Sequence, residues 1–146
     1  MKKLFILLLI FCLSVSALPV CAQEPVITVV VNGKVLETDV APKLVNNRTM
    51  LPMRAIFESL GAKVTWVDTD QLIFATKDDC LVVLSIGYDK MSVQKSNSVA
   101  TSSVHLDTAP FIFNSRTLVP VRAVAEALEA DVLWDGDTYT VTVTTK

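Results

Sequence analysis

Two pairs of arginine residues have the side chains best suited to chemistry in this sequence. Arg48 and Arg54 recur as Arg116 and Arg122 in a second copy of the same stretch. A guanidinium group is planar and donates hydrogen bonds in pairs, so it matches carboxylate and phosphate groups. One interpretation is therefore an anion or glycan-carboxylate site on each copy. The other, which we favour because most repeated features serve packing, is an internal bridge to a loop carbonyl or to one of the acidic residues Asp39, Asp107, Glu58 and Glu126.

Four aromatic residues could present a flat face to a ligand. Trp66 and Trp134 each follow a valine by two positions in an alternating stretch, which predicts that both side chains point into the core. Tyr88 and Tyr139 lie at or near predicted turns and are the pair expected to be more exposed. We therefore name Tyr88, Tyr139, Arg48 and Arg116 as the candidate binding residues.

Residues with catalytic chemistry are scarce. His105 is the only histidine, and Cys80 begins an apolar stretch that predicts a small buried residue. A serine or cysteine nucleophile would need His105 as its base, and one histidine without paired ligands is a poor basis for a metal site. Turn formation explains the aspartate pairs better than calcium binding, because no glutamate closes their loops; the pairs are Asp68 and Asp70, Asp78 and Asp79, and Asp135 and Asp137. We expect no enzymatic activity, no metal and no cofactor.

The arginines and tryptophans lie in a duplicated segment. Residues 39–66 return as residues 107–134 without a gap, and the arginines, prolines and tryptophans of the two copies coincide. Pro52 and Pro120 each precede an apolar stripe with helical spacing, a position where the missing N–H costs a helix least. Such duplication indicates a repeated folding unit. We assign Arg54, Arg122, Pro52, Pro120, Trp66 and Trp134 to the structural motif of this unit.

Each copy predicts the same order of elements. Residues 26–31 and 34–38 flank Asn32 and Gly33 as a β-hairpin, and residues 53–60 place four apolar side chains on one helical face. Gly61 suits the left-handed residue that ends this helix, and a second hairpin follows it. The predicted fold class is α+β: two similar repeats, each a β-hairpin, a short α-helix and a β-hairpin, with an antiparallel sheet packed on the helix.

The two copies differ at two places. Glu129 stands where the first copy has Gly61, so the second helix must end without the residue best suited to positive φ, or run slightly longer. Residues 95–104 are rich in serine, asparagine and threonine and are the best candidate for a mobile surface loop. We place the boundary between the units near Asp78 and Asp79, which gives repeats at residues 23–79 and 80–146.

The first 22 residues predict a compartment. A basic start, an apolar run over residues 4–15 and small residues up to Ala22 are typical of a secretory signal peptide that is cleaved after Ala22. Lipidation of Cys21 is a minor alternative, because Val20 is a poor fit to the small residue that this modification needs. Loss of two lysines with the signal would change the formal net charge from −2 to −4. We expect a secreted or envelope-associated chain without a later transmembrane segment, and no nucleic-acid partner because basic residues are not clustered.

The motif Asn-x-Arg-Thr-x-x-Pro-x-Arg-Ala occurs twice, each time followed by an amphipathic helix, Ala-x-Val-x-Trp and an aspartate-containing turn. It resembles the stalk domain named after the N-terminal domain of copper amine oxidases, in two tandem copies that together cover residues 26–144. The resemblance implies a small antiparallel sheet curled around a helix, used as a projecting or accessory module of secreted and envelope proteins. It does not imply amine oxidation, because the copper ligands and the quinone cofactor belong to a separate catalytic domain that nothing here matches.

From the residues and the resemblance we expect a secreted, non-catalytic module of the cell envelope with a structural or interaction role. It would bind a protein or cell-wall partner through hairpin edges and turns, including the addition of a strand to an exposed sheet edge. A glycan-binding module is the first alternative. A small envelope hydrolase that uses carboxylates near the aspartate turns is the second, and it requires two carboxylates that face each other across a cleft.

Overall fold

The computed structural model describes residues 24–146, so the predicted signal peptide lies outside the described residues. Within that range the chain forms thirteen strands and only two helices, α2 (Met53–Ser59) and α3 (Val121–Ala127). The fold is therefore mostly β, and the predicted α+β class is wrong. The helices have seven residues each, about two turns, so strands supply most of the core.

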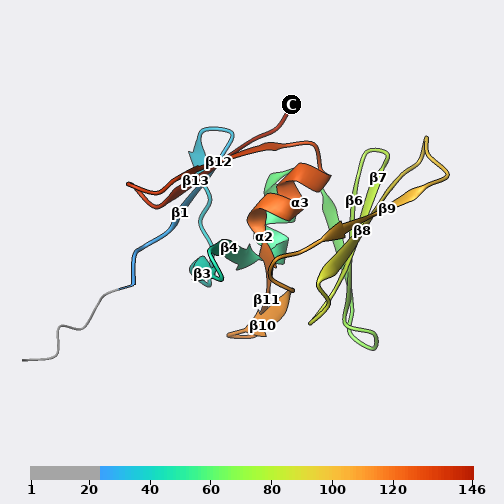
Figure 1. Cartoon of the computed structure of the whole chain (residues 1–146), viewed down its shortest axis with the longest axis horizontal. Helices are drawn as coiled ribbons and strands as arrows, with labels where there is room; N and C mark the ends of the chain where they lie inside the picture. Colours follow the sequence, from blue (N-terminus) through green and yellow to red (C-terminus); the bar gives the residue numbers. More distant parts are fainter. Residues whose placement is uncertain (1–23) are drawn as a thin grey trace, which may run out of the picture.

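The strands form three sheets. The terminal sheet contains, in order, β12 (Asp131–Asp135), β13 (Thr140–Thr144), β1 (Thr28–Val31) and β2 (Lys34–Val35). The middle sheet contains β10 (Phe111–Phe113), β11 (Arg116–Pro120), β4 (Arg48–Pro52) and β3 (Lys43–Val45). The five-stranded sheet contains β5 (Lys63–Val67), β6 (Leu72–Lys77), β7 (Cys80–Ser85), β8 (Lys90–Lys95) and β9 (Thr101–His105). Figure 1 shows the terminal and five-stranded sheets at opposite ends of the long axis, with the helices and the middle sheet between them.

The two copies of the duplicated segment share the middle sheet. β4 pairs with β11 in antiparallel register, so that Leu51 lies opposite Val119 and Met50 lies opposite Pro120. Positions 50 and 118 are equivalent in the two copies, as are 52 and 120, and exchanging the copies leaves this register unchanged. An approximate two-fold axis therefore passes through the pair of Leu51 and Val119. The predicted repeat, in which each copy packs its own sheet on its own helix, is wrong because the central strands of the copies pair with each other.

Both helices end in the same way despite their different sequences. Gly61 and Glu129 occupy the equivalent position after each helix, with φ of 83° and 62°. The residue that follows, Ala62 or Ala130, donates its N–H to a carbonyl of the last helical turn at 2.9 Å. This is the Schellman arrangement, which requires a left-handed residue. Glu129 therefore adopts the left-handed conformation, which is less favourable for glutamate than for glycine. The second helix has the same length as the first.

The first hairpin forms as predicted, but its partner strand breaks the approximate symmetry. Asn32 and Gly33 make its turn with φ of 49° and 79°. β1 then lies parallel to β13, with Val29 opposite Val141. The strand beside β6 in the five-stranded sheet is instead the antiparallel β7. The two-fold relation therefore does not extend to β1 and β7.

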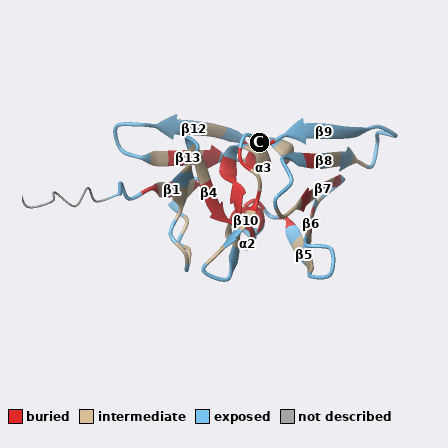
Figure 2. Cartoon of the chain, turned by 60° about the horizontal axis from the view of Figure 1, so that its bottom comes forward, coloured by how far each residue is buried: buried red, intermediate tan, exposed pale blue. Residues whose placement is uncertain are grey.

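One continuous core joins the three sheets and the two helices. It includes fully buried side chains from each part, such as Val29, Leu51, Ile56, Val82 and Val124. Figure 2 shows buried residues gathered on the helices and on the strands that face them, whereas β9 and β12 are largely exposed. Among the described residues, neither helix has the length and apolar character needed to cross a membrane.

Half of residues 95–104, predicted to be a mobile surface loop, form strands. Lys95 ends β8 and β9 begins at Thr101, which leaves only residues 96–100 as the connection. All five residues of β9 are exposed, and β9 pairs with β8 on one side only. The sequence of β9 resembles a loop because this edge strand is exposed on both faces and therefore lacks the apolar alternation of a buried strand.

Candidate functional site

Two open pockets lie at equivalent places, where the middle sheet meets each of the other sheets. The Trp134 pocket has a volume of about 260 Å³ and is lined by Leu44, Asn47, Arg48, Thr49, Pro120, Val121, Arg122, Val132, Trp134 and Val141. The Trp66 pocket has a volume of about 520 Å³ and is lined by Asp39, Pro52, Met53, Arg54, Ala55, Trp66, Ser115, Arg116 and Thr117. Each pocket combines a hairpin turn from one copy with the helix start and the tryptophan of the other copy.

Tight turns position the first arginine of each pocket. Asn46 and Asn47 connect β3 to β4 with φ of 50° and 58°, and Asn114 and Ser115 connect β10 to β11 with φ of 46° and 59°. Two consecutive positive φ angles are typical of the type I′ turns that match the twist of a hairpin. The arginine follows directly after each turn, so a rigid hairpin fixes its backbone.

Arg48 and Arg116 form reciprocal ion pairs between the copies. Nε of Arg48 donates to Oδ2 of Asp107 at 2.6 Å, and Nε of Arg116 donates to Oδ2 of Asp39 at the same distance. A second guanidinium nitrogen contacts the same carboxylate in each pair. The hydrogen bond from Arg116 lowers the pKa of Asp39 below its usual value. The predicted internal bridges are therefore confirmed for these two arginines, and each one joins one copy to the other.

Arg54 and Arg122 differ in their acidic neighbours. Nη1 of Arg54 lies 3.9 Å from Oε1 of Glu58, one turn further along α2. Arg122 has the equivalent Glu126 in its sequence, yet the described residues form no ion pair with it. Both arginines are exposed. Arg122 is therefore the arginine whose charge is available to a ligand.

The two tryptophans differ in how their indole N–H is used. Nε1 of Trp66 donates to Oδ1 of Asp68 at 3.3 Å, and the half-buried ring packs against the core. Gly136 occupies the position equivalent to Asp68, so Trp134 lacks this acceptor. Trp134 is also 39% exposed. The prediction that it is a core residue is therefore wrong. Both β5 and β12 are edge strands, so the edge position does not explain the difference; Trp66 packs against the core cluster and Trp134 does not.

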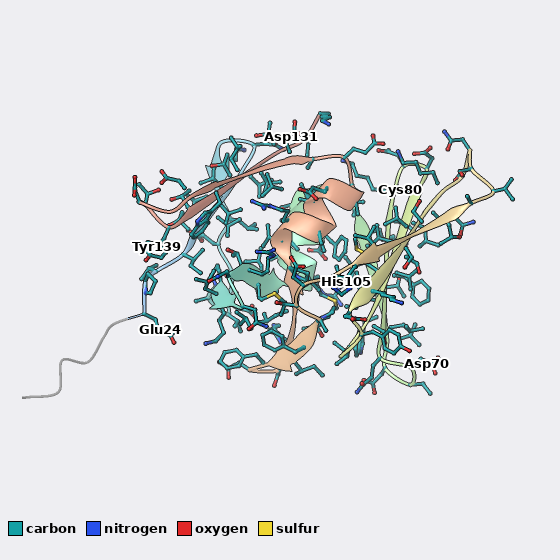
Figure 3. The ribbon with its side chains drawn as sticks, viewed as in Figure 1. Glu24, Asp70, Cys80, His105, Asp131 and Tyr139 are labelled. Atoms are coloured by element: carbon teal, nitrogen blue, oxygen red, sulfur yellow. The ribbon has the colours of Figure 1, made fainter. Side chains whose placement is uncertain are left out.

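Tyr139 lies beside Trp134, at the outer end of the terminal sheet (Figure 3). The two rings meet edge to face, with centroids 5.9 Å apart. Tyr139 has a φ of 50°, which is unusual for a bulky residue, and its carbonyl accepts the N–H of Thr28 at 3.0 Å. Gln71, at the equivalent position of the first copy, has a φ of 51°, so this conformation belongs to the repeated turn. The predicted exposure is confirmed for Tyr139 and also for Tyr88, which lines neither of the two pockets.

The two pockets differ in charge. Asp39 lines the Trp66 pocket beside Arg54 and Arg116, whereas no acidic residue lines the Trp134 pocket beside Arg48 and Arg122. Arg48 is nevertheless paired with Asp107, so Arg122 supplies the free positive charge of the Trp134 pocket. The other walls of the Trp134 pocket are mainly leucine, valine and proline side chains. Positive groups beside apolar walls are suited to an organic anion. The Trp134 pocket is therefore the better candidate site, although it has the smaller volume.

Among residues 24–146, the two side chains that a nucleophilic mechanism would combine, Cys80 and His105, lie apart. Cys80 is buried at the start of β7, and this burial raises the pKa of its thiol. His105 is exposed at the end of β9, where its Nδ1 lies 3.7 Å from Oδ2 of Asp89. Cys80 pairs with Lys95 at one end of β8 and His105 pairs with Lys90 at the other end, a separation that Figure 3 also shows. The predicted core position of Cys80 is confirmed.

Ion pairing and hydrogen bonding favour the charged form of two carboxylates near the turns. A hydrogen bond from Lys95 lowers the pKa of Glu129, and hydrogen bonds from Thr138 and Asp137 lower that of Asp135. A carboxylic acid that acts as a general acid needs the opposite shift. Oδ1 of Asp135 accepts the N–H of Asp137 at 2.9 Å, so this aspartate stabilises its turn as predicted. In the part of the chain that the structure describes, no three His, Cys, Asp or Glu side chains are placed to hold a metal ion.

Arg122 and Trp134 were not among the residues predicted to bind. They form a pocket only together with the turn before Arg48, and this turn belongs to the other copy of the duplication. The pairing of the copies that creates this neighbourhood cannot be deduced from the spacing of the repeats. One signal was available in the sequence. The exchange of Asp68 for Gly136 at equivalent positions marks Trp134 as the tryptophan with a different environment.

Comparison with known proteins identifies relatives of the chain. A family model described as the copper amine oxidase N-terminal domain matches residues 30–143, a segment that includes both copies of the duplication. The chain is also similar to a protein named "Protease inhibitor" from Brevibacillus choshinensis, with 29% identity over 121 residues. This similarity covers 82% of the chain and 35% of the relative, so the chain spans about a third of that protein's length.

Proposed function

The chain belongs to the copper amine oxidase N-terminal domain family, and from that premise we propose that it is a non-catalytic binding module of the cell envelope. It is secreted or envelope-associated, and its partner is a cell-wall glycan rather than a nucleic acid. The ligand site is the Trp134 pocket. The observation that carries this proposal is an open pocket with two arginines, an exposed tryptophan and no acidic lining residue.

The chemistry of the pocket supports binding over catalysis. A carboxylate-dependent hydrolase needs two carboxylates across a cleft, and no acidic residue lines the Trp134 pocket. A smaller pocket of about 130 Å³ does contain Asp78, Asp79 and Glu129, but Lys77, Lys95 and Lys146 line it as well. The contact with Lys95 keeps Glu129 charged, which opposes its use as a general acid.

The exposed aromatic pair supports a glycan over a protein partner. Trp134 and Tyr139 present flat, partly apolar rings with polar groups that remain in water, a combination suited to the faces of sugar rings. Edge strands are also present, since β9 pairs on one side only. Binding of a protein by strand addition to such an edge, the route expected from the sequence, is the alternative that an experiment must separate.

Sedimentation with purified bacterial cell wall tests the proposal. The purified protein should pellet with the wall, and an excess of soluble wall fragments should release it. A protein that stays in the supernatant, while an envelope protein is recovered with it from an extract, would favour protein assembly instead. New reducing ends released from the wall during the incubation would contradict the non-catalytic assignment.

Protease binding is a second candidate function. The similar protein from Brevibacillus choshinensis is named a protease inhibitor, and the connection between β8 and β9 presents the fully exposed side chain of Val99. An exposed apolar side chain on a loop could enter the specificity pocket of a protease. Inhibition of a panel of serine proteases that is lost in Val99→Asp would support this function; no inhibition of any member would remove it.

A further inference from the structure

We propose that the Trp134 pocket recognises a sugar ring that bears a carboxylate. This inference rests on the proposed function and adds the chemical class of the ligand. The pocket provides two separate features for such a group, a cation for the carboxylate and an aromatic surface for the ring. Both belong to the second copy of the duplication, and the turn of the first copy closes the pocket beside them.

Arg122 is the residue that binds the carboxylate. Nε and a second nitrogen of Arg48 already contact Asp107, and its Nη1 donates to the carbonyl of Asn47 at 3.2 Å. Arg122 forms no ion pair with the described residues, and it is exposed to solvent. A guanidinium with free donors binds a carboxylate in planar, bidentate geometry. Arg48 therefore shapes the pocket, and Arg122 holds the charge of the ligand.

Trp134 receives the ring. The indole remains 39% exposed, and its N–H lacks the carboxylate acceptor that Asp68 gives to Trp66. Tyr139 supports the indole from the side, at an angle of 85° between the ring planes. The pocket volume of about 260 Å³ lies just below the range of about 300–1,000 Å³ found for drug-sized ligands. A single sugar unit matches this size better than a longer segment of chain.

The Trp66 pocket provides an internal comparison within the same molecule. The pair of Arg116 and Asp39 has its equivalent in Arg48 and Asp107, so it does not separate the pockets. The pockets differ because Arg54 lies close to Glu58 and because Asp68 accepts the indole N–H of Trp66. Each of these carboxylates disfavours a bound anion by repulsion or by competition for the same donor. The inference is therefore specific: one pocket binds the acidic sugar and its equivalent does not.

Nuclear magnetic resonance of the two indole N–H groups in the ¹⁵N-labelled protein separates the pockets. Glucuronate should shift the Trp134 signal in a saturable way and leave the Trp66 signal in place. Arg122→Gln should weaken the affinity for glucuronate by about tenfold or more, the effect of losing a charged hydrogen-bond partner. The matched variant Arg54→Gln should bind as the wild type does. The unchanged Trp66 signal also reports that Arg122→Gln remains folded.

Three further probes define the ligand class. The methyl ester of glucuronate has the ring but no charge, and acetate has the charge but no ring. Each of these two probes should bind at least about tenfold more weakly than glucuronate. Inorganic phosphate that binds as tightly as glucuronate would overturn the requirement for a ring. Equal shifts of both indole signals, or an Arg122→Gln variant with wild-type affinity, would overturn the site.

The two proposals fail in distinguishable ways. Glucuronate binding at Trp134 by a protein that does not pellet with the wall would reject the proposed function and keep the inferred site. Pelleting of a protein that ignores glucuronate would keep wall binding and reject the acidic sugar as its ligand.

Discussion

Asp68 and Gly136 occupy equivalent positions, yet they leave the neighbouring tryptophans in different states. Asp68 accepts the indole N–H of Trp66, whereas Trp134 has no such partner. The same contrast separates Arg54, which has Glu58 nearby, from Arg122. A few side chains therefore decide which of the two equivalent pockets has a free positive charge.

The ion pair of Arg116 and Asp39 makes stability depend on pH. Arg116 lowers the pKa of Asp39 in the folded protein below its value in the unfolded chain, which is about 4. The charged carboxylate therefore stabilises the fold above about pH 4, and this contribution is lost as the pH falls through the lower folded pKa. We expect Asp39→Asn to reduce the urea midpoint at pH 7 and to differ less from the wild type as the pH approaches 3.

Asp70→Asn is the matched control for this prediction. Asp70 is exposed in the turn between β5 and β6 and forms no ion pair with the described residues. Its substitution should leave the pH dependence of the urea midpoint unchanged. An Asp39→Asn variant with the pH dependence of the wild type would contradict the stabilising role of the ion pair.

At the scale of elements, the end of α2 depends on a residue that tolerates positive φ. Gly61 has a φ of 83°, and no atom lies within 4 Å of the position that a Cβ would occupy, so backbone strain is the main cost of a side chain there. Gly61→Ala should lower the free energy of unfolding by about 1 kcal/mol, measured by urea denaturation. Gly136→Ala is the control, because Gly136 is not in the left-handed region, and it should change stability less. Equal losses in the two variants would contradict this account of the helix end.

Local elements were predictable where local sequence determines them. The helical stripe that includes Ile56 and Phe57 is buried, and Asn32 and Gly33 make the predicted turn. The parallel pairing of β1 with β13 was not predictable, because it joins strands that are far apart in the chain and lacks a turn of its own. Alternation along residues 64–66 and 132–134 placed both tryptophans in the core, but alternation does not show how far neighbouring segments cover each ring, and only Trp66 packs against the core cluster.

At the scale of the whole molecule, the pairing of β4 with β11 makes the two copies one cooperative unit. Leu51 is fully buried where these strands pair, within a core that includes residues from all three sheets. Leu51→Ala should lower the free energy of unfolding by about 2–5 kcal/mol, the usual cost of a cavity in a core. Fluorescence of Trp66 and Trp134, each measured with the other tryptophan replaced, should show the same transition midpoint in this variant.

The outcome that would contradict this prediction is a separate unfolding step for each tryptophan. The sequence division at residues 79 and 80 stays a prediction for the boundary of the duplication. This division does not imply that the two halves fold independently, because each half supplies two strands to the four-stranded middle sheet. The sharing of this sheet is also why the expected division into two separately packed repeats was wrong, whereas the α+β class was wrong because strands form most of the structure.

The candidate site, like the middle sheet, is built from both copies of the duplication. Arg48 and Tyr139 were predicted to bind from their types and positions, and the structure places both at or beside the Trp134 pocket. Arg116 lies in the equivalent pocket, and Tyr88 lies in a turn of the five-stranded sheet. Arg122 completes the candidate site only because the copies pair through the middle sheet, which no local pattern indicates.

Wall sedimentation of Trp134→Leu beside Trp66→Leu tests the central claim most directly. The two tryptophans occupy equivalent positions, but Trp66 packs against the core, so a loss of binding that came only from destabilisation should be larger in Trp66→Leu. The account predicts that Trp134→Leu loses most of its binding to purified cell wall while Trp66→Leu keeps it. Wild-type binding by Trp134→Leu, or equal losses in both variants, would contradict the assignment of the ligand site to the Trp134 pocket.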